Sequence, residues 1–124
     1  MSARLLIADD EPNILISLEF LMKREGYDVK VARDGQEAID AIVEHRPDLV
    51  LLDVMMPRKS GFDVCQEVRA HDAVKHTRIL MLTAKGRDTD VAKGLALGAN
   101  AYMTKPFSTK ELVEKVRELL ETPA

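Results

Sequence analysis

The sequence lacks the features that mark secreted, membrane-spanning and nucleic-acid-binding proteins. No apolar run approaches the roughly 20 residues that a transmembrane helix needs, and no secretory signal pattern precedes the first apolar run at Leu5. The 18 basic and 21 acidic residues are spread along the chain, without a basic stripe that would indicate a nucleic-acid site. We therefore expect a cytoplasmic domain that crosses no membrane and does not bind nucleic acid directly.

Cysteine and histidine are also scarce, which limits the chemistry open to the chain. The single Cys65 cannot form an internal disulfide, and it lies in an amphipathic stretch where a buried structural thiol is expected. The histidines stand in polar surroundings without the paired spacing of a metal site; they are His45, His71 and His76. We assign no chemistry to these four residues.

Short apolar runs alternate with amphipathic stretches along the chain, a pattern typical of strands and helices taking turns. The length fits a single domain, expected to span residues 1–124, without internal repeats or linkers. Continuous apolar runs such as Leu49–Leu52 favour a parallel sheet covered by helices on both faces, that is, a doubly wound α/β sandwich. The predicted strands are Leu5–Asp9, Tyr27–Ala32, Leu49–Asp53, Arg78–Thr83 and Asn100–Met103.

Helices are expected between these strands and after the last one. The residues that delimit them are, in chain order, Pro12 and Gly26, Asp34 and Pro47, Ser60, Asp88, and Ser108 with Glu111. Asp88 is a reasonable cap for the fourth helix. Gly94 lies inside that helix and costs about 1 kcal/mol relative to alanine, so we expect the fourth helix to be the most pliable.

Polar residues stand at the C-terminal ends of four predicted strands. They are Asp9 and Asp10, Asp53, Thr83, and Lys105. Because the C-terminal ends of parallel strands meet at one edge of the sheet, where ligands bind in such folds, these side chains should share a pocket. Each alone has an ordinary structural explanation as a helix cap, a strand end or a turn residue. Their joint appearance at four strand ends favours a functional site.

Three neighbouring carboxylates need a positive counter-charge. Two like charges about 4 Å apart repel by roughly 4 kcal/mol at an effective dielectric of about 20, so Asp9, Asp10 and Asp53 require compensation. Lys105 supplies one positive charge, whereas a divalent cation with oxygen ligands supplies two and can also hold a phosphate. The set favours Mg²⁺-assisted phosphoryl chemistry on Asp53, with the three acids titrating as a coupled unit.

Longer motifs surround these strand-end residues. They are Asp9-Asp10-Glu11, Asp53-Val-Met-Met-Pro57 followed by Gly61, Thr83-Ala84, and Lys105-Pro106-Phe107. In this order and spacing they resemble a response regulator receiver domain of two-component signalling, similar to the chemotaxis regulators. The resemblance covers essentially the whole chain. It implies a (βα)5 flavodoxin-like sandwich, with five parallel strands in the order 2-1-3-4-5.

The resemblance implies that Asp53 accepts a phosphoryl group. The donor would be a phosphohistidine on a sensor histidine kinase or on a histidine phosphotransfer protein. Lys105 would pair with one phosphoryl oxygen, and Thr83 would donate its hydroxyl to another. The peptide between Lys105 and Pro106 is expected to be cis, a conformation that is realistic only before proline.

The resemblance also implies Mg²⁺ as the cofactor. Asp10 and Asp53 would ligate the ion directly, Asp9 would do so directly or through water, and the backbone carbonyl of Met55 would complete the protein ligands. Glu11 matches the local pattern of the family but is expected to belong to the helix start, so it is not assigned to the metal site.

By the same resemblance, Thr83 and Tyr102 form a switch in which Thr83 moves toward the phosphoryl group and Tyr102 turns inward. On local grounds alone, Tyr102 could be a static aromatic of an edge strand. The surface expected to respond comprises the fourth helix, the fifth strand and the fifth helix. It includes Lys85, Val91, Leu95, Tyr102 and Lys110.

The implied partners are a sensor kinase or phosphotransfer protein, and a downstream effector or fused output domain. A phosphorylation-dependent dimer is left open. Regulators that dimerise through this surface often carry paired acidic residues before the switch aromatic, where this chain has Asn100 and Ala101. The residues after the last helix fit either a stand-alone receiver or one from a longer regulator.

Two other classes of protein fit the residues less well. A magnesium-dependent phosphatase usually needs a second catalytic acid close to its nucleophile, but Val54 and Met55 follow Asp53. A flavin-binding module on this fold needs a phosphate loop after the first strand, where Asp9 and Asp10 would repel a phosphate. We therefore expect a signalling switch that assists its own phosphorylation and dephosphorylation, and not an enzyme.

Overall fold

Five parallel strands form one sheet at the centre of the protein. A computed structural model describes residues 2–84 and 87–121, and within them the strand order is β2-β1-β3-β4-β5. Each neighbouring pair of strands is parallel. The strands are β1 (Arg4–Ala8), β2 (Asp28–Ala32), β3 (Leu49–Asp53), β4 (Arg78–Ala84) and β5 (Ala101–Lys105). The predicted topology is confirmed.

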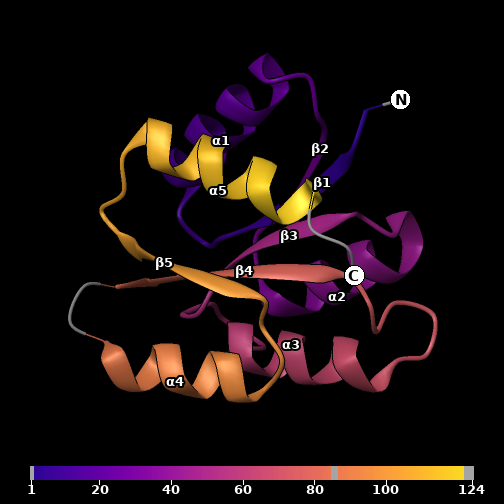
Figure 1. The fold of residues 1–124 in the computed structure, drawn as a ribbon. Helices are drawn as coiled ribbons and strands as arrows, with labels where there is room; N and C mark the ends of the chain where they lie inside the picture. The colour runs from indigo at the N-terminus through magenta and orange to yellow at the C-terminus, as the bar shows by residue number, and fades with distance from the viewer. Residues whose placement is uncertain (1, 85–86, 122–124) are drawn as a thin grey trace.

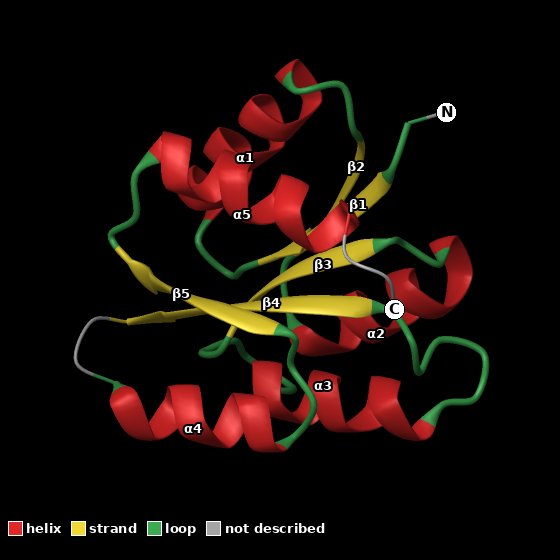
Figure 2. Cartoon of the chain, viewed as in Figure 1, coloured by secondary structure: helices red, strands yellow, loops and turns green. Residues whose placement is uncertain are grey.

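Helices cover both faces of the sheet, as the alternating pattern predicts. The described residues contain α1 (Pro12–Arg24), α2 (Gly35–His45), α3 (Gly61–Ala70), α4 (Asp88–Ala96) and α5 (Thr109–Glu121). The helices α1 and α5 lie on one face, and α2, α3 and α4 lie on the other (Figure 1, Figure 2). In the part of the chain that the structure describes, no helix is long and apolar enough to cross a membrane.

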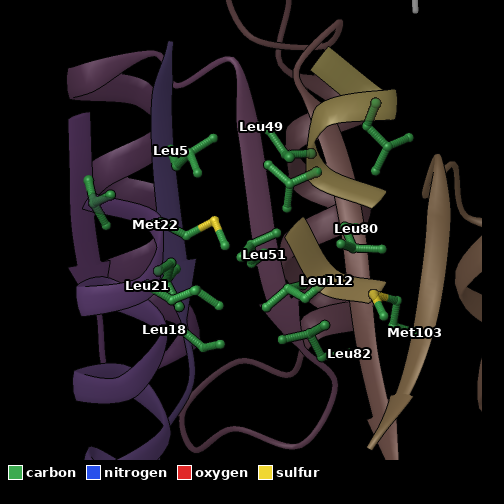
Figure 3. Packing of buried hydrophobic residues seen from close by; sticks show 14 of the residues in the cluster. Leu5, Leu18, Leu21, Met22, Leu49, Leu51, Leu80, Leu82, Met103 and Leu112 are labelled. Atoms are coloured by element: carbon green, nitrogen blue, oxygen red, sulfur yellow. The ribbon is translucent and has the colours of Figure 1, made fainter. Parts of the chain in front are cut away.

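The central strand β3 explains why the sheet carries two helical layers. All five of its residues are buried, so both of its faces are removed from water. On one face, Leu51 packs in a cluster with Met22 of α1 and Leu112 of α5 (Figure 3). On the other face, Leu52 packs in a second cluster with Ile42 of α2. This packing holds the C-terminal end of β3 in a fixed place at the edge of the sheet.

The start of α4 differs from the prediction, whereas the start of α2 agrees with it. The Asp34 carboxylate accepts a hydrogen bond of 2.9 Å from the Glu37 N–H and so caps α2. Asp88 is not the cap of α4 but its first helical residue, because the helix begins one position earlier than expected, with Arg87 at the N-cap. No described side chain caps that end. A carboxylate in the first turn is still favourable, because it faces the positive end of the helix dipole.

The last two strands extend further than predicted. The ladder between β4 and β5 continues through the pairs Thr83 with Thr104 and Ala84 with Lys105. The prediction that the last strand ends at Met103 is therefore wrong. Thr104 is exposed on an edge strand. Because it is polar, the apolar run ends before it, and the sequence pattern does not indicate that the strand continues. As a result, the sheet itself positions Lys105.

Candidate functional site

Three carboxylates and one ammonium group converge at the C-terminal edge of the sheet. Asp9 and Asp10 follow β1, Asp53 ends β3, and Lys105 ends β5. Carboxylate oxygens of the three aspartates all lie within 4.8 Å of one another. Asp9 is 1% exposed and Asp53 is 7% exposed, whereas Asp10 is open to solvent. The structure thus brings together the four charged residues that the sequence places at strand ends.

Backbone hydrogen bonds orient Asp9. Its N–H donates to the Ala32 carbonyl at 3.1 Å and so continues the ladder to β2 beyond the end of β1. Its Oδ1 atom accepts a hydrogen bond of 2.9 Å from the Glu11 N–H. Glu11 itself occupies the N-cap position of α1, as expected for a residue of the helix start. One carboxylate oxygen of Asp9 is thereby engaged by backbone, and the other faces the cluster.

A close backbone approach shapes the loop after Asp53. The Gly61 N–H donates to the Val54 carbonyl at 2.9 Å. A β carbon at Gly61 would collide with the Asp53 carbonyl oxygen, so only glycine permits α3 to begin there. Met55 lies in the same loop and is 62% exposed. The sequence motif includes Gly61, but only the fold supplies the steric reason for it.

Lys105 forms ion pairs with both buried carboxylates. Its Nζ atom lies 2.9 Å from Asp9 Oδ2 and 3.3 Å from Asp53 Oδ1. The peptide between Lys105 and Pro106 is cis, as expected. From the sequence, Lys105 is expected to supply one positive charge near the three carboxylates and to pair with a phosphoryl oxygen, whereas its direct ion pair with Asp9 is seen only in the structure. In the part of the chain that the structure describes, one ammonium pairs with a cluster of three carboxylates, so these residues together keep an excess of negative charge when all three acids are ionised.

The pKa values of Asp53 and Lys105 are both raised, for different physical reasons. Burial, followed by the nearby charge of Asp9, raises the pKa of Asp53 from 3.8 to about 6, although Lys105 opposes the shift. Burial alone would lower the pKa of Lys105, but its hydrogen bonds and attraction to Asp9 and Asp53 outweigh that effect and raise it. At neutral pH, Asp53 is therefore mostly a carboxylate and Lys105 an ammonium.

Thr83 lies at the same edge, near the end of β4, with its hydroxyl unused. The residue is 1% exposed, and its buried Oγ1 atom has no hydrogen-bond partner among the described residues. A buried hydroxyl without a partner costs free energy and is uncommon in folded proteins. Thr83 therefore has a donor available for a group that enters the site.

The residues assigned to the responsive surface lie mainly along β5 and its flanking helices. Tyr102 is 45% exposed on β5, opposite Met81 in the ladder with β4. Leu95 of α4 is exposed and Val91 is half-buried, while Lys110 is exposed at the start of α5. Lys85 lies outside the described residues. Tyr102 is thus an aromatic residue of an edge strand, and its ladder partner Met81 stands two residues before Thr83 in β4.

The donor set of the acidic cluster suits a hard divalent cation. Asp9, Asp10 and Asp53 offer carboxylate oxygens only, and among the described residues their ion pairs are with a single ammonium group, that of Lys105. Mg²⁺ is bound in proteins by one or a few carboxylates together with water and phosphate oxygens. A cation at this place would stand beside the Asp53 carboxylate, which is a potential nucleophile toward phosphorus.

Comparisons with known proteins point to one family. The family model of the response regulator receiver domain matches residues 5–117. A crystal structure described as a response regulator from Chloroflexus aurantiacus J-10-fl is 38% identical, with a TM-score of 0.94 over 98% of this chain and 100% of that one. The chemotaxis response regulator CheY4 of Vibrio cholerae is 32% identical, with a TM-score of 0.90 over 96% of this chain and 99% of that one.

A further solved structure concerns the acidic cluster. The receiver domain of the sensor histidine kinase PA1611 from Pseudomonas aeruginosa PAO1 is 27% identical, with a TM-score of 0.90. The alignment covers 98% of this chain and 100% of that one. That protein is described with a magnesium ion coordinated in its active site cleft.

Proposed function

The chain belongs to the response regulator receiver domain family of two-component systems, and on that basis we propose that Asp53 is its phosphoacceptor. The observation that carries the proposal is the setting of Asp53 at the end of β3. Its buried carboxylate touches Lys105, neighbours two further carboxylates, and shares the sheet edge with the unpaired hydroxyl of Thr83. These groups suit phosphoryl transfer, which depends on positioning and on stabilising the charge of the phosphoryl oxygens.

In the proposed reaction, an Asp53 oxygen attacks the phosphorus of a phosphohistidine on a sensor histidine kinase or phosphotransfer protein. The new O–P bond forms while the N–P bond breaks, and its electron pair returns to the imidazole nitrogen. The carboxylates of Asp9, Asp10 and Asp53 and the backbone carbonyl of Met55 would hold Mg²⁺, which supplies positive charge against the phosphoryl oxygens. Asp9 would do so directly or through water.

Lys105 and Thr83 would distinguish the phosphorylated state from the resting state. Transfer converts the Asp53 carboxylate into an acyl phosphate that carries roughly −2 charge at neutral pH. Lys105, which pairs with Asp53 at 3.3 Å in the resting state, would then pair with a phosphoryl oxygen. The Thr83 hydroxyl would gain the partner that it lacks. Such differential contacts are what a ligand needs to shift a conformational equilibrium.

We further propose that these contacts alter the surface formed by α4, β5 and α5, and that partners respond to this change. Movement of Thr83 would free space into which Tyr102 turns, and the altered surface would regulate an effector protein or a fused output domain. In this proposal residues 1–124 act as one cytoplasmic receiver domain. It acts as a switch that regulates its partners, and it assists its own phosphorylation and dephosphorylation. It does not turn over separate substrates as an enzyme does.

Acetyl phosphate labelling with Mg²⁺ tests the phosphoacceptor. The wild-type protein and Asp72→Asn, a substitution at an exposed position on another face, should both gain one phosphoryl mass in intact-protein mass spectrometry. Asp53→Asn should gain none. Labelling of Asp53→Asn at another residue would overturn the assignment. Steady turnover of a small phosphomonoester by the wild type would instead favour a phosphatase.

A further inference from the structure

The Arg69 side chain of α3 joins two loops that lie apart in the chain. Its Nε atom donates to the Gly98 carbonyl at 2.9 Å, and its Nη2 atom donates to Asn100 Oδ1 at 2.9 Å. Its Nη1 atom donates to the carbonyls of Lys75 and Thr77, at 2.9 and 2.6 Å. Four of the five guanidinium N–H groups therefore have acceptors, in the loop before β4 and in the turn before β5.

All four acceptors of Arg69 are neutral carbonyl oxygens of the backbone or of an amide side chain. Hydrogen bonds from an ionised donor are stronger than those between neutral groups, and the planar guanidinium holds several acceptors in one fixed arrangement. We call residues 97–100 the α4–β5 turn, since they join these two elements. Arg69 therefore fixes the position of this turn relative to α3 and to the start of β4.

Asn100 and Cys65 add further contacts to the α4–β5 turn. Asn100 Oδ1 also accepts a hydrogen bond of 2.8 Å from the Ile79 N–H, and the Asn100 N–H donates to the Ile79 carbonyl at 2.9 Å. The buried thiol of Cys65 in α3 donates to the Leu97 carbonyl at 3.5 Å. The turn is thus bonded to α3 and to β4.

Gly98 gives the α4–β5 turn a shape that accommodates Arg69. Its φ of +108° is a left-handed conformation that residues with a side chain rarely adopt. A β carbon at this position would lie only 3.0 Å from Cγ and from Nε of Arg69. The backbone of the turn therefore comes close enough to the arginine to receive the hydrogen bond from Nε.

The two ends of α4 are held differently. The helix lies beside α3 on the same face of the sheet (Figure 1). In its last turn, Lys93 lies over the ring of Phe62 in α3, with Nζ 4.6 Å from the ring centre. At its first turn no described side chain caps the helix, and Arg87 pairs with Asp90 of the same turn. These interactions with α3 therefore lie at the C-terminal end of α4.

We propose that Arg69 is a positioning residue that anchors the C-terminal end of α4 to α3, so that α4 moves by pivoting about the α4–β5 turn. Hinges of this kind are formed by a few residues at the ends of elements. The first turn of α4, which follows the strand that carries Thr83, would then move most. The inference rests on the proposed function for the response to Asp53, but not for the anchoring itself.

Amide hydrogen exchange tests the anchoring in the unphosphorylated protein. Arg69→Gln should accelerate exchange at residues 97–100 about tenfold, while the amides of β1 and β3 keep their wild-type rates. Arg46→Gln, at an exposed arginine after α2, is the matched control and should behave as the wild type. Unchanged exchange in the turn of Arg69→Gln, or equal acceleration throughout the sheet, would overturn the proposal.

A second variant should act in the opposite direction, which general damage to the fold would not do. Asn100→Asp keeps the acceptor oxygen and adds a negative charge beside the Arg69 guanidinium, so exchange in the turn should slow about threefold. The same substitution in the Arg69→Gln background should bring no slowing, because the partner is missing. Slowing in both backgrounds, or in neither, would contradict the anchoring by Arg69.

Exchange with acetyl phosphate and Mg²⁺ tests the pivot. In the labelled wild type, the amides of Asp90 and Val91 should change about threefold or more, while residues 97–100 change by less than about twofold. Equal changes at both ends of α4 would rule out a pivot at the turn. Intact-protein mass spectrometry of the same samples separates the two proposals. If no phosphoryl mass appears, the proposed function is wrong, and the variants at Arg69 and Asn100 still decide the anchoring.

Discussion

The strands β3 and β5 belong to one sheet but differ in what surrounds them. All five residues of β3 are buried, including Asp53, whereas only Met103 is buried among the five residues of β5. β3 pairs with β1 and β4, while β5 pairs with β4 alone in the described residues. Segments with few buried contacts move at a lower free-energy cost than central strands. The comparison teaches that Asp53 stands on the most constrained strand of the sheet, whereas Tyr102 and Lys105 stand on a strand with far fewer buried residues.

Lys105 joins these two regions. It ends β5, yet its ammonium pairs with Asp9 and Asp53 at the ends of the central strands. Thr83 makes a second connection, because it is the ladder neighbour of Thr104 on β5. A change of charge at Asp53 therefore acts directly on Lys105, which belongs to the edge strand.

The largest contrast should come from truncating one side chain in each region. Leu51→Ala on β3 removes a fully buried side chain and should lower the free energy of unfolding by about 3 to 4 kcal/mol. Tyr102→Ala on β5 should cost less than about 1 kcal/mol, since the tyrosine is half exposed. Urea denaturation followed by circular dichroism measures both. Similar losses in the free energy of unfolding of the two variants would contradict the difference in constraint between β3 and β5.

The charge of Asp53 should weaken the metal-free fold as the pH rises. Its folded pKa of about 6 exceeds the ordinary value of 3.8, so its contribution is fully present below about pH 4 and is lost as the pH rises through 6. The shift corresponds to about 3 kcal/mol. Asp53→Asn should therefore be more stable than the wild type by about this amount at pH 7 in a chelator, with the difference vanishing near pH 4.

The exposed Asp72→Asn serves as the control for this series and should follow the wild type across the same pH range. Urea denaturation at several pH values gives the comparison. A constant difference between Asp53→Asn and the wild type would show that burial and the charge of Asp9 do not act on Asp53 as described.

Magnesium should reverse the destabilisation at the centre. An ion that binds only the folded state, present at a concentration about 100 times its dissociation constant, adds about 2.7 kcal/mol to the free energy of unfolding. Thermal melts with Mg²⁺ and with a chelator should differ clearly for the wild type and for Tyr102→Ala. The difference should be much smaller for Asp10→Asn, which lacks one of the three carboxylates. An undiminished response in Asp10→Asn would contradict its place among the metal ligands.

The smallest effect is expected at Thr83. Thr83→Val replaces a buried hydroxyl without a partner by a methyl group of similar shape and should stabilise the resting protein by about 1 kcal/mol. Under the proposed function, the same change should reduce the response of β5 amide exchange to acetyl phosphate. Calorimetry and hydrogen exchange measure the two effects. A less stable Thr83→Val would mean that the hydroxyl is satisfied in the resting state.

Much of the fold was predictable because its signals are local. The apolar run of β3 indicates a strand buried on both faces, and Asp34 caps α2 through a residue three positions away. Prediction was wrong where local signals are weak, at the N-cap of α4 and at the polar end of β5. An exposed threonine on an edge strand looks like a turn, and only its ladder partner in β4 makes it a strand residue.

The sequence by itself determined which charged residues meet, because parallel strands bring their C-terminal ends to one edge of the sheet. Asp9, Asp10, Asp53 and Lys105 could be grouped on that ground alone. Only the tertiary structure decided how they interact: the ammonium of Lys105 lies between two carboxylates, and burial raises the pKa of Asp53. The unpaired hydroxyl of Thr83 also arises only in the fold, because distances between groups far apart in the chain, and their removal from water, depend on packing.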